Sequence, residues 1–248
     1  MARRQRPNVP VVIDGHEVMA YPDESVLSAA DREGIRIPRL CALEGTSVHG
    51  GCRLCVVEVA ERHKLMPACG TTVVEDMEVR TRSRSLDEHR KLICELLLAE
   101  GNHVCAVCVS NGACELQDLA EELGVDHVRP DYQFPRRSVD ASHPKYTFDP
   151  NRCVLCTRCV RTCAEVEGAH VWDLAGRASG SHLIADLGQE WGEAPSCTWC
   201  GKCVAVCPTG ALAWKGKAVG EMRHDPSLVA FLSAAREQGE WVDREALR

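Results

Sequence analysis

Residues 153–163 read Cys-Val-Leu-Cys-Thr-Arg-Cys-Val-Arg-Thr-Cys, and residues 197–208 read Cys-Thr-Trp-Cys-Gly-Lys-Cys-Val-Ala-Val-Cys-Pro. Both runs place four cysteines at the spacing C-x2-C-x2-C-x3-C. Such a repeated pattern indicates one structural unit that uses all eight sulfurs together. Pro208 ends the second run, and its fixed φ and missing N–H turn the chain away after Cys207.

This spacing is typical of a domain with two [4Fe-4S] clusters, in which the fourth cysteine of each run ligates the other cluster. The cysteines of a short loop reach three iron corners of a cube, but the fourth corner faces away from that loop. The predicted ligand sets are therefore crossed: Cys153, Cys156, Cys159 and Cys207 for one cluster, and Cys163, Cys197, Cys200 and Cys203 for the other. Structural zinc is the alternative, but two matched runs of four cysteines favour iron–sulfur clusters.

The composition fits a chain that depends on metal clusters for its stability. It has 248 residues and 16 cysteines, and only 4% of its residues are aromatic. A large apolar core is hard to build from so few aromatic residues, so clusters are expected to supply part of the missing stabilisation. The start Met-Ala-Arg-Arg-Gln-Arg has no signal peptide features. The cysteines are therefore predicted to be thiolate ligands in a reducing cytoplasm.

Charge and hydropathy argue against two classes of function. The formal net charge is -7, and cluster thiolates would add negative charge, which disfavours nucleic-acid binding. No run of eighteen apolar residues occurs, so no membrane-spanning helix is expected. Arg3, Arg4 and Arg6 are interpreted as a solvated terminus, with contact to a partner as the alternative.

Residues 1–84 predict a separate iron–sulfur domain. Residues 10–22 alternate around a turn at Asp14-Gly15 and predict a β-hairpin, and Asp23 is expected to cap a helix that ends at Gly34. Four cysteines follow, which are Cys41, Cys52, Cys55 and Cys69. Together they predict a β-grasp-like ferredoxin domain with one [2Fe-2S] cluster. The spacing departs from the plant-type pattern, and four cysteines could also bind zinc.

An amphipathic helix is predicted over residues 85–100, ending at Gly101. Its expected buried side carries Leu92, Ile93, Leu96 and Leu97. Cys94 lies inside this helix without a partner at ligand spacing, so it is predicted to be a core residue.

A small ligand set follows this helix. Cys105, Cys108 and Cys114 leave one iron corner of a [4Fe-4S] cluster open. His103 lies two residues before Cys105, and a neutral imidazole can ligate iron. A surface or outer-shell role for His103 remains the alternative, as do water or Cys94 as the fourth ligand. A short amphipathic helix from Cys114 is expected to end at Gly124.

The whole chain therefore predicts an α+β protein built from several modules. The expected order is a [2Fe-2S] domain over 1–84, a helical [4Fe-4S] module over 85–124, a linker over 125–144, a two-cluster domain over 145–220 and a C-terminal helix within 221–248. The 33-residue insert between the two cysteine runs predicts strands at 169–174 and 182–185, with His170 and Trp172 packed next to a cluster. The apolar face of the last helix is expected to dock on a partner or on its own ferredoxin unit.

Four motifs carry a resemblance to known proteins. They are Asn-His-Val-Cys-Ala-Val-Cys at 102–108, Cys-Glu-Leu-Gln-Asp at 114–118, Cys-Val-Leu-Cys-Thr-Arg-Cys-Val-Arg at 153–161 and Glu-Gly-Ala-His-Val-Trp-Asp at 167–173. With this order of modules, the chain resembles the iron–sulfur region shared by the large electron-transfer subunit of respiratory complex I and by iron-only hydrogenases. It is most similar to the small iron–sulfur diaphorase subunit (HoxU) of soluble NAD-linked nickel–iron hydrogenases, over nearly its whole length.

The resemblance implies that His103 is a cluster ligand and that the first domain holds a [2Fe-2S] cluster rather than zinc. It also implies partners: a flavin subunit that binds NAD(P), and a hydrogenase small subunit in a complex with the large [NiFe] subunit. The complex I pattern places three residues between the histidine and the first cysteine, whereas here only Val104 intervenes. The loop at His103 must therefore be tighter or shaped differently.

The expected function is electron relay through one [2Fe-2S] and three [4Fe-4S] clusters. The sequence has no G-x-G-x-x-G or P-loop motif, ends forty residues after Pro208 and leaves no ligand set for nickel. No flavin, NAD, nickel or substrate-converting site is therefore expected on this chain. The alternatives are a relay subunit of another flavin-linked complex, such as an NAD-dependent formate dehydrogenase, or a structural protein with clusters or zinc as staples.

Overall fold

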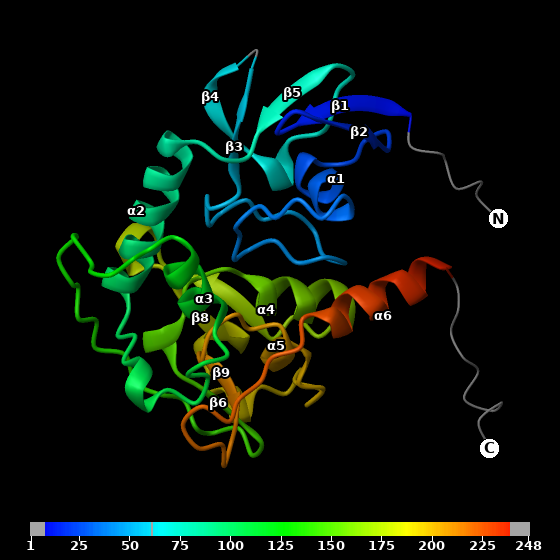
Figure 1. The fold of residues 1–248 in the computed structure, drawn as a ribbon. Coiled ribbons are helices and arrows are strands. Elements are labelled where there is room, and N and C mark those ends of the chain that lie inside the picture. The colour runs from blue at the N-terminus through cyan, green and yellow to red at the C-terminus, as the bar shows by residue number, and fades with distance from the viewer. Residues whose placement is uncertain (1–7, 61, 239–248) are drawn as a thin grey trace. The chain divides into compact units, whose positions relative to one another are not determined.

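The computed structural model describes residues 8–60 and 62–238, so Arg3, Arg4 and Arg6 lie outside the described residues (Figure 1). The chain divides into two compact units. The first contains residues up to 42, 50–96 and 119–129, and the second contains 43–49, 97–118 and the chain from 130 onward. Residues 43–49, which lie in sequence between Cys41 and Cys52, thus belong to the second unit.

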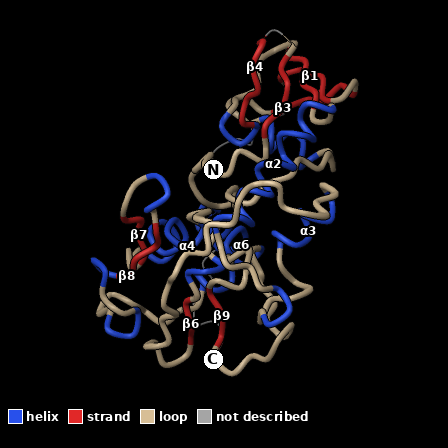
Figure 2. Tube along the Cα trace, turned by 90° about the vertical axis from the view of Figure 1, so that its left-hand side faces the viewer, coloured by secondary structure: helices blue, strands red, loops and turns tan. Residues whose placement is uncertain are grey.

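The first unit contains a five-stranded sheet with the order β2-β1-β5-β3-β4 (Figures 1 and 2). Its strands are β1 (Val9–Ile13), β2 (His16–Ala20), β3 (Val56–Val59), β4 (Arg62–Pro67) and β5 (Met77–Arg80). The predicted hairpin is confirmed, because β1 and β2 pair antiparallel with Val9 opposite Ala20. β1 also pairs parallel with β5, which places Val11 opposite Met77. This mixed sheet is of the β-grasp type expected from the sequence.

Helix α1 (Val26–Arg32) completes the core of the first unit. Val26, Ala29 and Ala30 are fully buried in one cluster with the inward side chains of β1, β2 and β5. The prediction that Asp23 caps this helix is wrong. The cap is Ser25, whose hydroxyl accepts a hydrogen bond from the Ser28 N–H at 3.1 Å. The hydroxyl satisfies an amide that would otherwise have no partner at the helix start.

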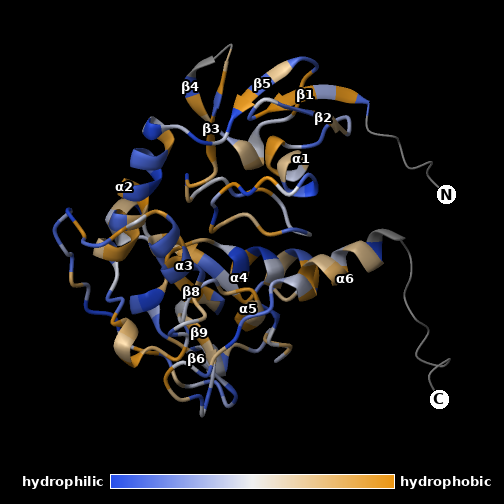
Figure 3. Cartoon of the chain, viewed as in Figure 1, coloured by the Kyte–Doolittle hydropathy of each residue, from blue (hydrophilic) through white to orange (hydrophobic). Residues whose placement is uncertain are grey.

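Helix α2 (Arg84–Glu100) has the predicted bounds but a different buried side. Leu92 and Leu96 are exposed, whereas Leu86, Arg90 and Cys94 are buried at four-residue spacing. Figure 3 shows hydrophilic and hydrophobic residues mixed along this helix. The prediction, which followed the apolar residues, is wrong because the charged Arg90 lies in the middle of the buried side.

Arg90 is buried because its guanidinium binds backbone carbonyls of the neighbouring chain. Its Nε donates to the Leu54 carbonyl at 3.1 Å, and an Nη donates to the Val56 carbonyl at 2.8 Å. These carbonyls flank Cys55 in sequence. Arg90 therefore holds the start of β3 and the backbone on either side of a candidate ligand.

Replacing Arg90 with Met should lower the free energy of unfolding of the first unit by about 1–3 kcal/mol, because two carbonyls lose buried donors. The Arg84→Met variant is the matched control. Arg84 lies on the same helix, is exposed and pairs with Glu88 at the surface, so its replacement should change the free energy of unfolding little. Anaerobic urea unfolding of the holoprotein measures both. Equal urea midpoints for the two variants would contradict the role given to Arg90.

The second unit contains the two cysteine runs inside one frame. Strands β6 (Tyr146–Phe148) and β9 (Leu212–Trp214) pair antiparallel before the first run and after the second. Helices α4 (Arg158–Arg161) and α5 (Lys202–Ala205) lie within the two runs, and α4 continues into a π-helical turn over Thr162–Glu167. Helix α3 (Glu115–Glu122) begins directly after Cys114.

The two runs share their backbone conformation as well as their spacing. Leu155 and Trp199, at equivalent positions, have φ values of 51° and 61°. The residue before each helix is also left-handed: Thr157 at 58° and Gly201 at 73°. Glycine is required at 201 for a second reason, because a Cβ there would lie 2.7 Å from the Tyr146 hydroxyl oxygen. The sequence repeat is thus a repeat of structure.

The insert between the runs forms a hairpin of β7 (Trp172–Ala175) and β8 (His182–Ala185). The first strand begins three residues later than the predicted residue 169. Trp172 is buried in the core of the second unit. His170 is exposed, so the prediction that it packs next to a cluster is wrong.

Helix α6 (Ser227–Gln238), red in Figure 1, packs within the second unit. Val229 is fully buried in a cluster with Val166 and Val206. An Arg236 Nη donates to the Glu165 carbonyl at 3.2 Å. This helix was expected to dock on a partner or on its own ferredoxin unit. The described part of it docks on its own ferredoxin unit. Among the described residues, no helix is both long and apolar enough to cross a membrane.

Candidate iron–sulfur sites

The eight cysteines of the two runs line two separate cavities in the second unit. Cys153, Cys156, Cys159 and Cys207 line the first cavity, whose other walls are mostly aliphatic, with Phe148 and two threonines. The second cavity is lined by Cys163, Cys197, Cys200 and Cys203, and its walls include one tyrosine and three tryptophans. Each cavity takes three sulfurs from one run and one from the other. The structure therefore brings together the two crossed sets that the spacing predicts.

Burial keeps the thiols of Cys153, Cys156 and Cys159 protonated in the absence of metal. It raises the pKa of Cys153 to about 11 and of Cys156 to about 12, and it raises that of Cys159 well above its usual value. Iron binds the thiolate form, so the ligation of a cluster here would release protons. Soft sulfur donors around an apolar cavity fit an iron–sulfur cluster, which would supply one-electron redox chemistry.

N–H groups directed at the sulfurs favour the thiolate form. The Val171 N–H donates to Cys163 Sγ at 3.3 Å. Burial raises the pKa of Cys203, and a hydrogen bond from the Trp172 indole N–H partly opposes this rise. Burial also raises the pKa of Cys207, and backbone N–H groups of Thr209, Ala211 and Leu212 partly oppose it. Such hydrogen bonds are one means by which a protein sets the reduction potential of a cluster.

The four candidate ligand cysteines of the first unit lie in two pairs. Cys41 forms a side-chain hydrogen bond with Cys52, and Cys55 forms one with Cys69. Within the first pair, this bond lowers the pKa of Cys52 to about 5 and raises the pKa of Cys41. The hydrogen bond in the second pair likewise raises the pKa of Cys55 and lowers the pKa of Cys69. Two ligand pairs suit a [2Fe-2S] cluster, in which each iron takes two protein sulfurs.

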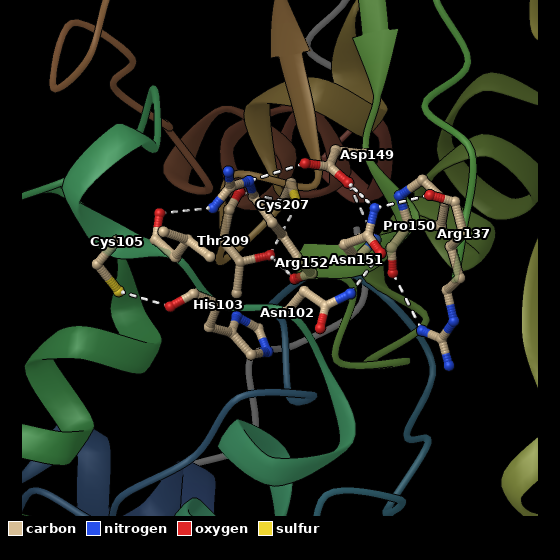
Figure 4. A network of polar contacts seen from close by, with 11 residues as sticks. Asn102, His103, Cys105, Arg137, Asp149, Pro150, Asn151, Arg152, Cys207 and Thr209 are labelled. Atoms are coloured by element: carbon tan, nitrogen blue, oxygen red, sulfur yellow. Dashed lines mark hydrogen bonds and ion pairs between the residues drawn. The ribbon is translucent and has the colours of Figure 1, made fainter. Parts of the chain in front are cut away.

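His103 has the chemistry of a ligand, although its ring does not face Cys105. Burial lowers the pKa of the imidazole, so it is neutral near pH 7, and its buried Nε2 has no hydrogen-bond partner. Cys105 Sγ lies 3.5 Å from the His103 carbonyl oxygen, and Figure 4 shows the imidazole extending to the other side of the backbone. The ring packs against Gly101, where a Cβ would lie 2.5 Å from Nε2.

A polar network holds the loop that carries His103 (Figure 4). The Asn102 side chain donates to Asn151 Oδ1 at 3.0 Å, and an Arg152 Nη donates to the Val104 carbonyl at 3.2 Å. Thr209 Oγ1 in turn donates to the Arg152 carbonyl at 2.7 Å. The His103 loop is thus bonded to residues next to Cys153 and Cys207. These polar residues were not predicted from the sequence, where only their position next to candidate ligands indicates a role.

Cys108 and Cys114 also lie against the segment that follows Cys207. A Cβ at Gly210 would lie 2.5 Å from Cys108 Sγ. The Glu115 N–H donates to the Pro208 carbonyl at 2.9 Å. The Glu115 carboxylate accepts two hydrogen bonds from the buried Arg158, at 2.6 and 2.9 Å. Two ligand-bearing segments far apart in sequence are therefore packed directly on each other.

Cys94 behaves as the predicted core residue. It is fully buried in α2, and burial raises the pKa of its thiol to about 11. Across residues 8–60 and 62–238, no three His, Cys, Asp or Glu side chains are grouped closely enough to hold a single metal ion. The cysteines of the two runs meet around the two cavities, and the four of the first unit meet in two pairs, whereas the His103 ring does not face Cys105.

Three family models match successive parts of the chain. A "2Fe-2S iron-sulfur cluster binding domain" matches residues 6–84, and the "NADH-ubiquinone oxidoreductase-G iron-sulfur binding region" matches 90–129. The ferredoxin-like domain of NADH-quinone oxidoreductase subunit 3 matches 144–213. With the fold and the cysteine sets, these matches define a multi-domain iron–sulfur protein of mixed α and β structure, as the sequence predicted.

Individual relatives specify the family. The chain is 36% identical to the NADPH-Fe(3+) oxidoreductase subunit alpha of Geobacter sulfurreducens, over 84% of this chain and 24% of the relative. It is 37% identical to the NADP-reducing hydrogenase subunit HndD of Solidesulfovibrio fructosivorans, over 82% and 35%. It thus spans about a quarter to a third of the length of these curated relatives. A chain of the NAD+-reducing [NiFe]-hydrogenase in the H2-reduced state matches with a TM-score of 0.80 and 35% identity, over 85% of this chain and 88% of that one.

The chain belongs to the family of iron–sulfur electron-transfer subunits shared by NAD(P)-linked hydrogenases and complex I-like enzymes. The relatives are subunits of oxidoreductases, which agrees with the redox role expected from the sequence.

Replacing Gly210 with Ala should disturb the cluster at Cys108. A Cβ at 2.5 Å from Cys108 Sγ cannot be accommodated without moving that sulfur or the loop. We expect the anaerobically prepared variant to lose up to about four irons per chain. Colorimetric iron analysis measures this loss. Gly180→Ala is the control, because a Cβ there meets nothing within 4 Å. A Gly210→Ala chain with the full iron content would show that this close approach does not constrain the site.

Proposed function

We propose that this chain relays single electrons in an NAD(P)-linked [NiFe]-hydrogenase. It would pass them between a flavin subunit, which exchanges hydride with NAD(P), and the hydrogenase small subunit, which adjoins the large [NiFe] subunit. The observation that carries the proposal is the match over 85% of this chain to a chain of NAD+-reducing [NiFe]-hydrogenase, joined to the two sets of four cysteines that line the cavities of the second unit. No substrate-converting site is proposed on this chain.

Four clusters are proposed, each with its own ligands. The [2Fe-2S] cluster takes Cys41, Cys52, Cys55 and Cys69, and the first [4Fe-4S] cluster takes His103, Cys105, Cys108 and Cys114. The other two [4Fe-4S] clusters take the crossed sets that line the two cavities. The role of this chain is to space, bury and hydrogen-bond these sulfurs, since these properties set the potential of each cluster.

His103 is proposed as the single imidazole ligand. The support is its buried Nε2 without a hydrogen-bond partner, together with a neutral ring. An orphaned buried acceptor costs about 1–3 kcal/mol, which coordination of iron would recover. The ring faces away from Cys105, so we infer that it rotates about its side-chain bonds when the cluster is bound.

Chemical analysis and spectroscopy test the relay function. The anaerobically prepared chain should contain about fourteen irons and as many sulfides, the sum for one [2Fe-2S] and three [4Fe-4S] clusters. Within the complex, NADH should produce EPR signals of reduced clusters, because relay centres must accept electrons from the flavin. Zinc in place of iron, or clusters that stay EPR-silent with NADH, would instead support the structural alternative.

Substitutions at His103 test its ligand role separately. His103→Cys should keep the cluster but lower its potential, because a thiolate adds negative charge where imidazole is neutral. His103→Ala should reduce the iron content or alter the EPR signal of that cluster alone. EPR-monitored redox titration and iron analysis measure both effects. Unchanged iron, potential and EPR in His103→Ala would mean that His103 is not a ligand.

A second candidate is a relay subunit of another flavin-linked complex, such as an NAD-dependent formate dehydrogenase. It is kept because the relatives include an NADPH-Fe(3+) oxidoreductase subunit at a similar identity to the hydrogenase subunit. Metal analysis of the complex purified through this chain separates the two: nickel supports the hydrogenase, and molybdenum supports the rival.

A further inference from the structure

His143 is a buried histidine whose ring reaches a candidate cluster ligand. It lies just before β6 and is 1% exposed. Its Nε2 is 3.9 Å from Cys197 Sγ, within reach of a long N–H···S hydrogen bond. His143 lies in the predicted linker over residues 125–144, for which the sequence indicates no role.

The backbone around His143 fixes which ring nitrogen carries the proton. Nδ1 accepts hydrogen bonds from the N–H groups of Lys145 at 3.1 Å and Tyr146 at 3.2 Å. A nitrogen that accepts from backbone donors has no proton of its own, so the neutral ring carries its proton on Nε2. Nε2 is therefore the donor, and Cys197 Sγ is the acceptor.

The segment before His143 is bonded to the segment that contains Trp191, a residue that lines the same cavity as Cys197. Asp140 Oδ2 accepts from the Trp191 N–H at 2.7 Å, and Ser142 Oγ accepts from the Gly192 N–H at 2.8 Å. Gly192 permits this approach, because a Cβ there would lie 2.8 Å from the His143 backbone nitrogen. These contacts fix the backbone on which the imidazole stands.

Aromatic side chains hold the ring in place. His143 stacks on Tyr146 at a centroid distance of 4.6 Å and lies 4.7 Å from Trp191 and 5.0 Å from Trp199. These three residues also line the cavity of Cys163, Cys197, Cys200 and Cys203. The ring thus has a fixed position and a fixed tautomer, and its Nε2–H lies next to Cys197 Sγ.

We propose that His143 is a positioning residue for this cluster: its Nε2–H donates to Cys197 Sγ and raises the reduction potential of the cluster. A hydrogen bond to a ligand sulfur withdraws negative charge and so favours the reduced, more negative state. The inference rests on the proposed ligand role of Cys197 but not on the identity of the partner complex.

Two variants isolate the donor. His143→Asn places an amide oxygen near the position of Nδ1, so it can still accept from Lys145 and Tyr146, but it has no atom that reaches Cys197. His143→Gln carries an amide N–H to about the position of Nε2. Both lose the aromatic stacking, and His143→Gln also loses the acceptor for Lys145 and Tyr146, so a potential restored by Gln would come from the N–H donor alone. His182→Asn, an exposed histidine on β8, is the control for histidine loss.

EPR-monitored redox titration of the full holo chain supplies the readout. With His143→Asn, one [4Fe-4S] signal should show about a tenfold lower ratio of reduced to oxidised cluster at a fixed potential, equal to about 59 mV for one electron. His143→Gln should restore most of this ratio, and His182→Asn should leave it unchanged. An unchanged titration of His143→Asn with full iron content would overturn the proposal, as would equal shifts in the Asn and Gln variants.

A measurement without any change at residue 143 covers the case in which both variants lose the cluster. The chain for this measurement carries His103→Cys, which removes the histidine proposed as a direct ligand, and is labelled with 15N-histidine. Pulsed EPR of its reduced clusters should show a weak coupling to the His143 nitrogen and a coupling to the Nε2 proton that is lost in D2O. The absence of both would overturn the proposal. Should the unsubstituted chain bind no cluster at Cys197, the proposed function itself would fail at that site.

Discussion

The second unit depends on the enclosure of thiolate sulfur in apolar surroundings. Eight cysteines line its two cavities, and burial raises the pKa of thiols such as Cys153 and Cys156. A buried thiolate without a partner is costly, so these side chains favour the charged form only when iron is present. Because iron ligation joins the two runs, the packing of this unit and its metal content are expected to change together.

The backbone around the sulfurs supplies the hydrogen bonds that a thiolate needs. The hairpin of β7 and β8 presents the Val171 N–H to Cys163, and the turn after Cys207 presents several N–H groups to one sulfur. The same turn contacts the His103 loop through Thr209 and Arg152, and Cys108 through Gly210. A short segment therefore serves two of the proposed clusters, which explains why small residues and close approaches gather there.

The spacing of the cysteines predicted which sulfurs gather at each cavity, because the shape of a cysteine loop depends on residues close together in sequence. The hairpin around Gly15 was predicted correctly because it too depends on neighbouring residues. Other features depend on partners distant in sequence. Arg90 is buried only because carbonyls beside Cys55 are placed to receive it, so the apolar pattern of α2 chose the wrong side. The role proposed for His143 depends on contacts with Trp191 and Gly192, which lie far from it in sequence, and no local pattern marks them.

The paired runs differ in the residue that precedes their helix. Both need a left-handed residue before the helix; the second run has Gly201, whereas the first has the β-branched Thr157 at φ 58°. Glycine adopts this conformation freely, but a β-branched residue there bears a strain of about 1–3 kcal/mol. The metal bonds of Cys156 and Cys159 on either side would have to offset it. If iron is lost, this strain is no longer offset, so the backbone of the first run should relax before that of the second.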